Sequence, residues 1–308
     1  MGDGQGDQRA AVRPPVVCLT DVPTRVQTAR GQAHRLGLPE VASIGDVAPG
    51  RLFLAVTDDA VELRRSAGRG PAARPDARQD ARQDVRKNPS RARRASSGDA
   101  GRVMLSVDLL AAARQPARQR LTARQPLARA IGSSRARVLD VTAGLGEDAA
   151  RLAVYGCEVT AVERHPALVF LLDDALQRAA DEHGAAGDEP RAAGLSARLH
   201  VEHADAADVL SAIERGERPR PDVVCIDPMF PPKRRPSALP PLAAQILREL
   251  VGDDPDAGDV LALARRACRR VVVKRPDHAP PLAEPVTASF PGRTVRYDLY
   301  TNPHVPRA

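Results

Sequence analysis

From Arg137 onward, short apolar runs alternate with longer segments that have helical periodicity. This alternation is typical of a parallel sheet with helices on both faces, because each parallel strand needs a crossover connection. We expect strands at 138–142, 158–162, 199–202, 223–226 and 271–274, and helices at 147–155, 166–182, 206–214, 240–250 and 257–268. Two closing strands, at 286–290 and 294–300, share a Pro-Gly-Arg turn and predict one antiparallel edge strand.

The first third of the chain has a different pattern. Residues 1–65 read as a small N-terminal α/β region, with strand-like runs at 16–19, 51–56 and 61–63 and a helix across 22–36. Residues 66–101 hold few large apolar groups and a tandem Asp-Ala-Arg-Gln repeat, so they cannot bury enough surface to offset their ordering entropy. We therefore expect a flexible insert there and a third region, 102–308, that opens with a strand at 103–107.

Positive charge is concentrated in the middle of the chain. Residues 66–137 carry 17 basic and 5 acidic side chains, whereas the whole chain has a net charge of only +7. A concentrated basic stretch attracts polyanions, and nucleic acid is the obvious one. The alternative is a solvated insert without a partner.

Composition excludes several classes. Aromatic residues make up 2% of the chain, which disfavours RNA-binding folds that stack bases on aromatic platforms. The four cysteines form no CxxC pair, so neither a disulfide framework nor a metal site is expected. No apolar run approaches the roughly 20 residues of a membrane span, and no secretory signal opens the chain, so a cytoplasmic protein is expected.

The first chemical motif follows the strand at 138–142 and opens a helix. Gly144 and Gly146 allow a sharp turn and a close approach of ligand to backbone. The acids at the helix start, Glu147 and Asp148, repel a pyrophosphate but suit the sulfonium and ammonium of S-adenosylmethionine (SAM). Asp140, at the strand end, can sit near the cofactor's amino group. An NAD site, which the GxGxxA match allows, and a plain strand-turn-helix with acids at its N-terminus remain the alternatives.

Two more acids follow the next two strands. Glu163 can accept both ribose hydroxyls of a nucleoside cofactor, a device that NAD and SAM sites share. The alternative is a surface ion pair with Arg164. Asp205, beside Ala206, can accept from an adenine amino group.

The most specific motif is Asp227-Pro228-Met-Phe230, which follows the buried run 223–226. It resembles the (Asp/Asn)-Pro-Pro-(Tyr/Phe) signature of methyltransferases that act on exocyclic or amide nitrogens. An acceptor on the N–H aligns such a weakly nucleophilic amine, and Asp227 with the Pro228 carbonyl would be that acceptor. Phe230 would stack on a flipped base. A strand followed by a Pro-rich loop is the alternative.

Basic side chains near these motifs are candidates for RNA phosphates. Lys233, Arg234 and Arg235 follow the Asp-Pro-Met-Phe motif directly. Lys274 and Arg275 end the strand at 271–274, where they can hold a phosphate or position their own loop. A solvated basic tip is the alternative for this second pair.

Several stretches together resemble one family: DVTAGLGEDA, VERHP, LLDDAL, IDPMFPPK and VVVKRPDHAPPL followed by RYDLY. They are similar to RsmJ, a bacterial 16S rRNA (guanine-N2)-methyltransferase family, from about Arg137 to His304. The resemblance implies an α/β fold: a Rossmann-like seven-stranded class I methyltransferase sheet, here with a small N-terminal α/β extension and a disordered basic insert. It also implies SAM as cofactor and small-subunit rRNA as partner. By motif, SAM contacts fall on Glu147, Asp148, Glu163, Arg164, Asp205, Ala206 and Asp227.

The sequence departs from the family at three places. Asp205-Ala206 stands where the family has two serines, and Glu147 stands where it has arginine. A basic, Gly-rich stretch of the family corresponds to residues 113–126 here, which keep the positive charge but not the glycines. Two alternatives to an rRNA methyltransferase therefore stay open. One is an N-methyltransferase for another nucleic-acid base or a protein amide, and the other is an inactive rRNA-binding relative.

Overall fold

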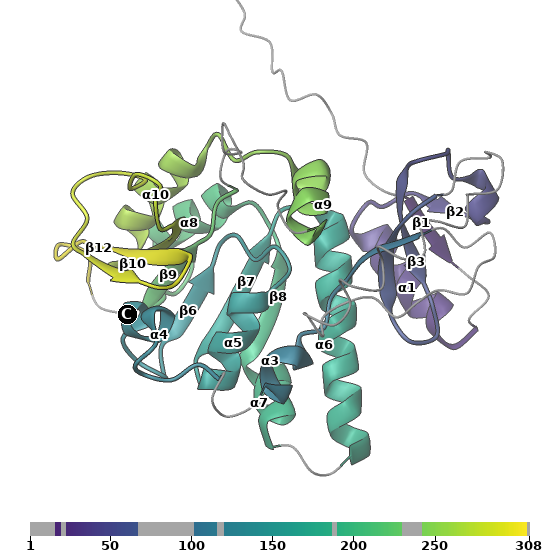
Figure 1. Ribbon diagram of the computed structural model, residues 1–308, viewed down its shortest axis with the longest axis horizontal. Helices are drawn as coiled ribbons and strands as arrows, with labels where there is room; N and C mark the ends of the chain where they lie inside the picture. Colours follow the sequence, from purple (N-terminus) through teal and green to yellow (C-terminus); the bar gives the residue numbers. More distant parts are fainter. Residues whose placement is uncertain are drawn as a thin grey trace, which may run out of the picture.

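Two β-sheets, joined by one long helix, organise the chain (Figure 1). The computed structural model describes residues 16–19, 23–66, 102–115, 120–186, 190–229 and 242–306. Within these residues, no helix combines the length and hydrophobicity that crossing a bilayer requires. The predicted insert lies almost wholly outside the described residues.

The larger sheet has seven strands. In spatial order they are β11 (Ala288–Pro291), β12 (Val295–Thr301), β10 (Arg270–Pro276), β9 (Val223–Ile226), β6 (Arg137–Asp140), β7 (Glu158–Glu163) and β8 (Leu199–His203). The five strands from β10 to β8 are parallel, and β12 is antiparallel to both of its neighbours. The prediction of one antiparallel edge strand is wrong in this detail, because β12 lies inside the sheet and β11 forms the edge.

Apolar residues alternate along the strands and bury both faces of this sheet. One face packs against α3 (Leu110–Arg114), α4 (Pro126–Ile131), α5 (Glu147–Tyr155), α6 (Pro166–Ala186) and α7 (Pro190–Arg198). The other face packs against α8 (Ala206–Glu214) and α10 (Ala257–Ala267). On β6, Val138 faces the first group of helices and Leu139 the second, as the period of two in a strand requires.

The smaller sheet has the strand order β2 (Glu40–Val41), β1 (Val16–Leu19), β3 (Leu52–Val56), β4 (Val61–Arg65) and β5 (Arg102–Ser106). Helix α1 (Pro23–Arg35) packs on it, and a 3-10 turn (Ile44–Asp46) follows β2. β5 pairs antiparallel with β4. The strand expected to open the third region therefore completes the N-terminal sheet, and the boundary predicted after residue 65 moves past β5.

Helix α6 is buried from two sides. It packs against β7 and β8 of the large sheet and against β4 of the small one (Figure 1). Its residues 167–172 are all buried, which is typical of a helix that is apolar on every side. The helix α9 (Leu242–Val251) contacts β5 and adds to the same core.

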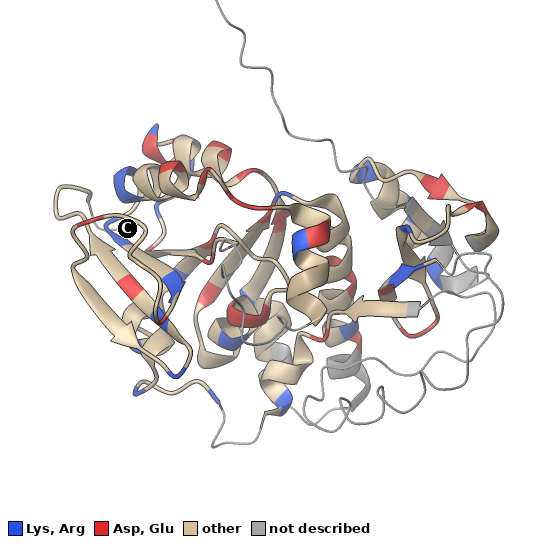
Figure 2. Cartoon of the chain, turned by 45° about the horizontal axis from the view of Figure 1, so that its top comes forward, with Lys and Arg blue, Asp and Glu red and all other residues tan. Residues whose placement is uncertain are grey.

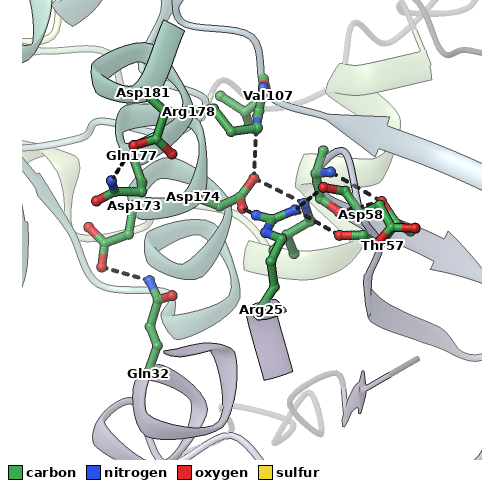
Figure 3. A network of polar contacts seen from close by, with 12 residues as sticks. Arg25, Gln32, Thr57, Asp58, Val107, Asp173, Asp174, Gln177, Arg178 and Asp181 are labelled. Carbon is green, nitrogen blue, oxygen red and sulfur yellow. Dashed lines mark hydrogen bonds and ion pairs between the residues drawn. The ribbon is translucent and has the colours of Figure 1, made fainter. Parts of the chain in front are cut away.

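Polar contacts complete this junction (Figure 3). Asp174 of α6, whose side chain is 3% exposed, pairs with Arg25 of α1 and accepts the backbone N–H of Val61 on β4 at 2.9 Å. One residue earlier, Asp173 accepts from the Gln32 amide at 2.9 Å. The small sheet is therefore fixed to the back of α6 by a buried carboxylate.

Candidate active site

Charged side chains meet at one edge of the large sheet. Asp140 and Glu163 are the last residues of β6 and β7, Asp205 and Asp227 follow β8 and β9, and Lys274 stands near the end of β10. Because these five strands are parallel, their carboxyl ends meet at the same edge. Figure 2 shows further acidic residues on the loop between α9 and α10, which closes this edge.

The two-glycine turn connects β6 to α5. Gly144 has a φ of 55° and Gly146 a φ of 71°, both in the left-handed region that side-chain-bearing residues avoid. A Cβ at Gly146 would also stand 2.7 Å from Leu172 and 3.0 Å from Leu109. Only glycine at this position lets α5 begin so close to α6.

Asp227 lies beside that turn. Its backbone N–H donates to Thr142 Oγ1 at 2.6 Å, which joins the end of β9 to the loop after β6. Two residues on, the Met229 N–H donates to Asp254 Oδ2 at 2.8 Å, and Asp254 itself pairs with Arg164. The start of the Asp-Pro-Met motif is thus held from both sides, by the glycine turn and by the loop before α10.

Lys274 links two of the carboxylates. Its Nζ stands 2.8 Å from Asp227 Oδ2 and 3.0 Å from Asp148 Oδ2, at the first turn of α5. Arg151 also binds Asp148, at 3.0 Å. Asp227 Oδ1 has no donor among the described residues, and the Asp227 side chain is 42% exposed. One oxygen of Asp227 is therefore fixed, and with respect to the described residues the other is an available acceptor.

The electrostatics of this cluster follow from burial and from that single lysine. Burial, opposed by the Thr142 N–H, raises the pKa of Asp140 to about 7. Burial also raises the pKa of Asp227, although Lys274 opposes it. Burial would raise the pKa of Asp148, but Lys274 and Arg151 together outweigh it, so this pKa lies below its usual value. The two carboxylates in turn hold the pKa of Lys274 above its usual value against the effect of burial, so the ammonium stays charged.

Glu163 is 6% exposed and is fixed by two backbone N–H groups. Gly144 donates to its Oε2 at 2.9 Å and His165 to its Oε1 at 2.8 Å. Burial raises its pKa, and these two donors oppose that rise. Each carboxylate oxygen has two acceptor sites, so each keeps one for a further donor. A pair of ribose hydroxyls matches those remaining sites.

A cleft opens along this edge, between the ends of the parallel strands and the helices α9 and α10. Seven of the residues predicted for the site line it: Gly144, Glu163, Arg164, Asp205, Ala206, Asp227 and Pro228. Four other predicted residues are not among those that line it: Asp140, Gly146, Glu147 and Asp148. The apolar side chains of Leu247 and Val251 on α9 and Val260 on α10 line the cleft as well.

Three predicted residues have partners that the sequence did not suggest. Asp205 caps α8, because its Oδ1 accepts the Ala207 N–H at 2.8 Å. Arg164 forms no pair with Glu163 and binds Asp254 and Asp256 instead. Arg275 was expected either to hold a phosphate or to position its own loop. It is 8% exposed and donates to the Pro280 carbonyl at 2.7 Å, so it positions the loop.

Lys274 is also not a free basic tip, given its two carboxylate partners. The remaining predictions, Phe230 and the basic run Lys233, Arg234 and Arg235, lie outside the described residues. Sequence reasoning missed Thr142, Asp254 and Tyr297. Tyr297, from the RYDLY stretch, stands opposite Lys274 on β12 and is 6% exposed. Its burial beside Asp148 raises the pKa of the phenol to about 12.

Comparison with known proteins shows which family this chain belongs to. Residues 77–302 match the family model of SAM-dependent methyltransferases. The chain belongs to the SAM-dependent methyltransferase family. A crystal structure of a SAM-dependent methyltransferase from Neisseria gonorrhoeae has a TM-score of 0.63 and 25% identity, and the match covers 94% of this chain and 97% of that one. The predicted class I methyltransferase fold and SAM as methyl donor are confirmed.

Curated relatives refine the family. Ribosomal RNA small subunit methyltransferase J of Thioalkalivibrio sulfidiphilus is 45% identical over 57% of this chain and 67% of its own length. The proteins of the same name from Cronobacter sakazakii and Pseudomonas aeruginosa are 46% and 44% identical, with 64% and 65% of their lengths covered. The resemblance to RsmJ is confirmed, and the chain spans about two thirds of the length of these relatives.

The residues of the cleft fit SAM. The sulfonium and the ammonium of SAM are cationic. The described residues around the cleft include more carboxylates than cations, so they attract these two groups. Glu163 keeps two acceptor sites for ribose hydroxyls, and the apolar side chains of α9 and α10 that line the cleft provide surface for an adenine ring. A pyrophosphate, by contrast, would meet Glu147 and Asp148 at the start of α5, so the structure disfavours the NAD alternative.

Proposed function

We propose that this methyltransferase acts on small-subunit ribosomal RNA and methylates the exocyclic N2 amine of a guanine in the 16S molecule. The relatives' name and the Asp-Pro-Met motif support this substrate. The observation that carries the proposal is the open Oδ1 of Asp227, an acceptor at the mouth of the SAM cleft. An rRNA substrate also implies a cytoplasmic location.

Asp227 provides the catalytic acceptor. The guanine N2 lone pair is delocalised into the ring, so the amine is a weak nucleophile. A hydrogen bond from its N–H to Asp227 Oδ1 fixes the direction of that lone pair and draws off positive charge as the new N–C bond forms. When bound, SAM would supply the electrophilic methyl group, and its sulfur would keep the electron pair of the broken C–S bond and leave as S-adenosylhomocysteine. Asp227 then accepts the amine proton, or holds it until water removes it.

Other residues hold the cofactor. Glu163 accepts the ribose hydroxyls, and the carboxylates near the start of α5 attract the cationic end. Asp205 keeps Oδ2 for the adenine amine, since its Oδ1 already caps α8. The backbone of the two-glycine turn lies against the cofactor because no side chain intervenes at Gly144.

Lys274 positions Asp227 and keeps it ionised. Burial alone favours the neutral carboxylic acid, which accepts an N–H poorly. The ammonium at 2.8 Å opposes this effect and also fixes the rotation of the carboxylate. Lys274 touches neither ligand in this scheme and acts through Asp227.

A transfer assay with tritiated SAM tests the substrate. Small subunits and naked rRNA from a strain that lacks this protein are offered beside DNA and total protein. We expect label in 16S rRNA alone, and mass mapping should locate one methyl group on a guanine N2. Label in DNA or protein, or none in rRNA, would contradict the proposed substrate.

The catalytic role of Asp227 has its own test. Asp227→Ala should lower kcat by about 100-fold or more, as loss of a general base usually does, and weaken SAM binding far less, because Glu163 and Asp205 still hold the nucleoside. Asp259→Ala, an exposed carboxylate on α10, is the matched control and should keep wild-type kcat. If Asp227→Ala retains wild-type turnover, Asp227 is not the acceptor. If the wild type binds rRNA without turnover, the chain is the inactive relative.

A further inference from the structure

A second charged feature lies beside the site. Between Leu109 and Leu139 the chain contains seven arginines and no aspartate or glutamate. In Figure 2 the described part of this stretch carries blue and tan residues and no red. A stretch of this length without acids cannot neutralise its own charge, so any compensation must come from elsewhere.

The stretch packs along the β11–β12 hairpin through α4. A Cβ at Gly292, in the turn of that hairpin, would stand 3.8 Å from Pro126 Cγ at the start of α4. One turn further along α4, the Arg129 guanidinium lies 5.1 Å from the centre of the Phe290 ring on β11. The start of α4 and the hairpin turn therefore form one continuous surface.

Three exposed arginines stand on this surface. Arg124 precedes α4 by two residues, Arg129 lies within it, and Arg293 follows Gly292 in the hairpin turn. None of the three has a carboxylate partner in the part of the chain that the structure describes. Exposed cations without counter-ions are available to an external anion.

Strand register places this surface next to the reacting groups. Phe290 stands opposite Tyr297, and Tyr297 stands opposite Lys274, so the three residues form a row across β11, β12 and β10. Neighbouring strands are about 4.8 Å apart, which puts Phe290 about 10 Å from the lysine that holds Asp227. The hairpin turn lies beyond this row, on the carboxyl side of β10, where the cleft opens.

We propose that Arg124, Arg129 and Arg293 form a docking surface for the phosphates of RNA that flank the target base. This inference rests on the proposed function. The hairpin lies within about 10 Å of the strand end that carries Lys274, the partner of Asp227, so phosphates bound here would lie close to the base that Asp227 holds. The same charge in a membrane-binding or acidic-protein-binding surface would not need to lie beside the acceptor.

The test compares two triple variants with the same change in charge. The first is Arg124→Gln, Arg129→Gln and Arg293→Gln. The control is Arg198→Gln, Arg215→Gln and Arg269→Gln, three exposed arginines at the opposite edge of the sheet, where β8, β9 and β10 begin. Binding of naked 16S rRNA is measured by filter retention between 50 and 300 mM salt. SAM affinity and transfer to small subunits are measured on the same preparations.

The docking variant should bind rRNA at least tenfold more weakly at moderate salt. Its slope of log affinity against log salt should be less steep by about 2.7, since three phosphates are no longer neutralised and each contributes about 0.9. The KM for RNA should rise while kcat and SAM affinity stay near wild type, and the affinity of the control should fall by less than threefold. Equal weakening in both variants, or an unchanged slope in the docking variant, overturns the proposal. If the wild type binds rRNA but transfers no methyl, the proposed function fails while the surface stands.

Discussion

Removing Lys274 should move the pH dependence of the enzyme rather than abolish turnover. Lys274→Met keeps the length and the apolar stem but deletes the only cation that contacts Asp227 among the described residues. An opposite charge at this distance lowers a carboxyl pKa by about 1 to 3 units. The Asp227 side chain is 42% exposed, so water screens the pair and the lower end, about 1 unit or 1.4 kcal/mol, applies.

The sign follows from the direction of the shift. Asp227 works as an acceptor when ionised, so activity falls as pH drops through its pKa. Without the ammonium that pKa rises, and the acid limb of kcat/KM, which reports the free enzyme, should move upward by about 1 pH unit. At pH values below the Asp227 pKa, the variant should be about tenfold less active than the wild type. At alkaline pH, where kcat/KM no longer changes with pH, it should recover much of that activity. Lys274→Arg should restore the wild-type limb.

The matched control is Arg151→Met. Arg151 binds Asp148 at 3.0 Å in the same cluster but does not contact Asp227, so its removal should leave the acid limb within a few tenths of a unit. Thermal unfolding of all three variants at neutral pH checks that the fold persists. An unmoved limb in Lys274→Met, or the same reduction at every pH, would refute the role given to the lysine.

Three further predictions concern stability. Gly146→Ala should destabilise by about 2–4 kcal/mol in urea unfolding, because strain at positive φ adds to the clash with Leu172, whereas Gly144→Ala should cost only about 1 kcal/mol for the φ alone. The folded-state pKa of Asp140 is about 7, so its carboxyl binds a proton more tightly in the folded than in the unfolded chain. The wild type should therefore lose a few kcal/mol of stability as pH rises from about 4 to about 7. Asp140→Asn should flatten this fall. Asp174→Ala should cost about 3 kcal/mol and increase amide exchange in β3 and β4, since it leaves the Val61 N–H and Arg25 without their partner; unchanged exchange would contradict this.

Local signals were enough to predict most elements of the larger sheet. The helices expected at 147–155 and 206–214 match α5 and α8 residue for residue. In both cases the termini carry local signals, because α5 starts and ends at left-handed glycines and Asp205 caps α8. Helix α7 was missed because it follows α6 with no strand between them, so the alternation of strands and helices gave no signal for a second helix there.

Contacts between segments far apart in the sequence could not be predicted from local patterns. β5 has the composition of a strand, but its pairing with β4 spans the whole insert, and no local pattern records such a register. The ion-pair partners of Lys274 could not be predicted for the same reason. On its own strand it is a cation at a loop, and its carboxylates come from β9 and α5. The sheet topology had to be known before the lysine could be separated from an RNA contact.

The charge pattern at this edge agrees with two ligands of opposite sign. SAM has cationic centres and RNA is a polyanion, so one uniform field would repel one of them. Carboxylates gather at the ends of β6 to β9, whereas the arginines of α4 and the hairpin lie across β10, β12 and β11. Phe290, beneath Arg129, lies about 10 Å from Lys274, and the strands that carry the carboxylates lie on the far side of that lysine's strand. The separation therefore exceeds the Debye length of about 8 Å at physiological salt, and the two fields can persist side by side. Lys274 lies on the boundary between them, which is where a single ammonium can serve the acidic side without drawing a phosphate into the cofactor cleft.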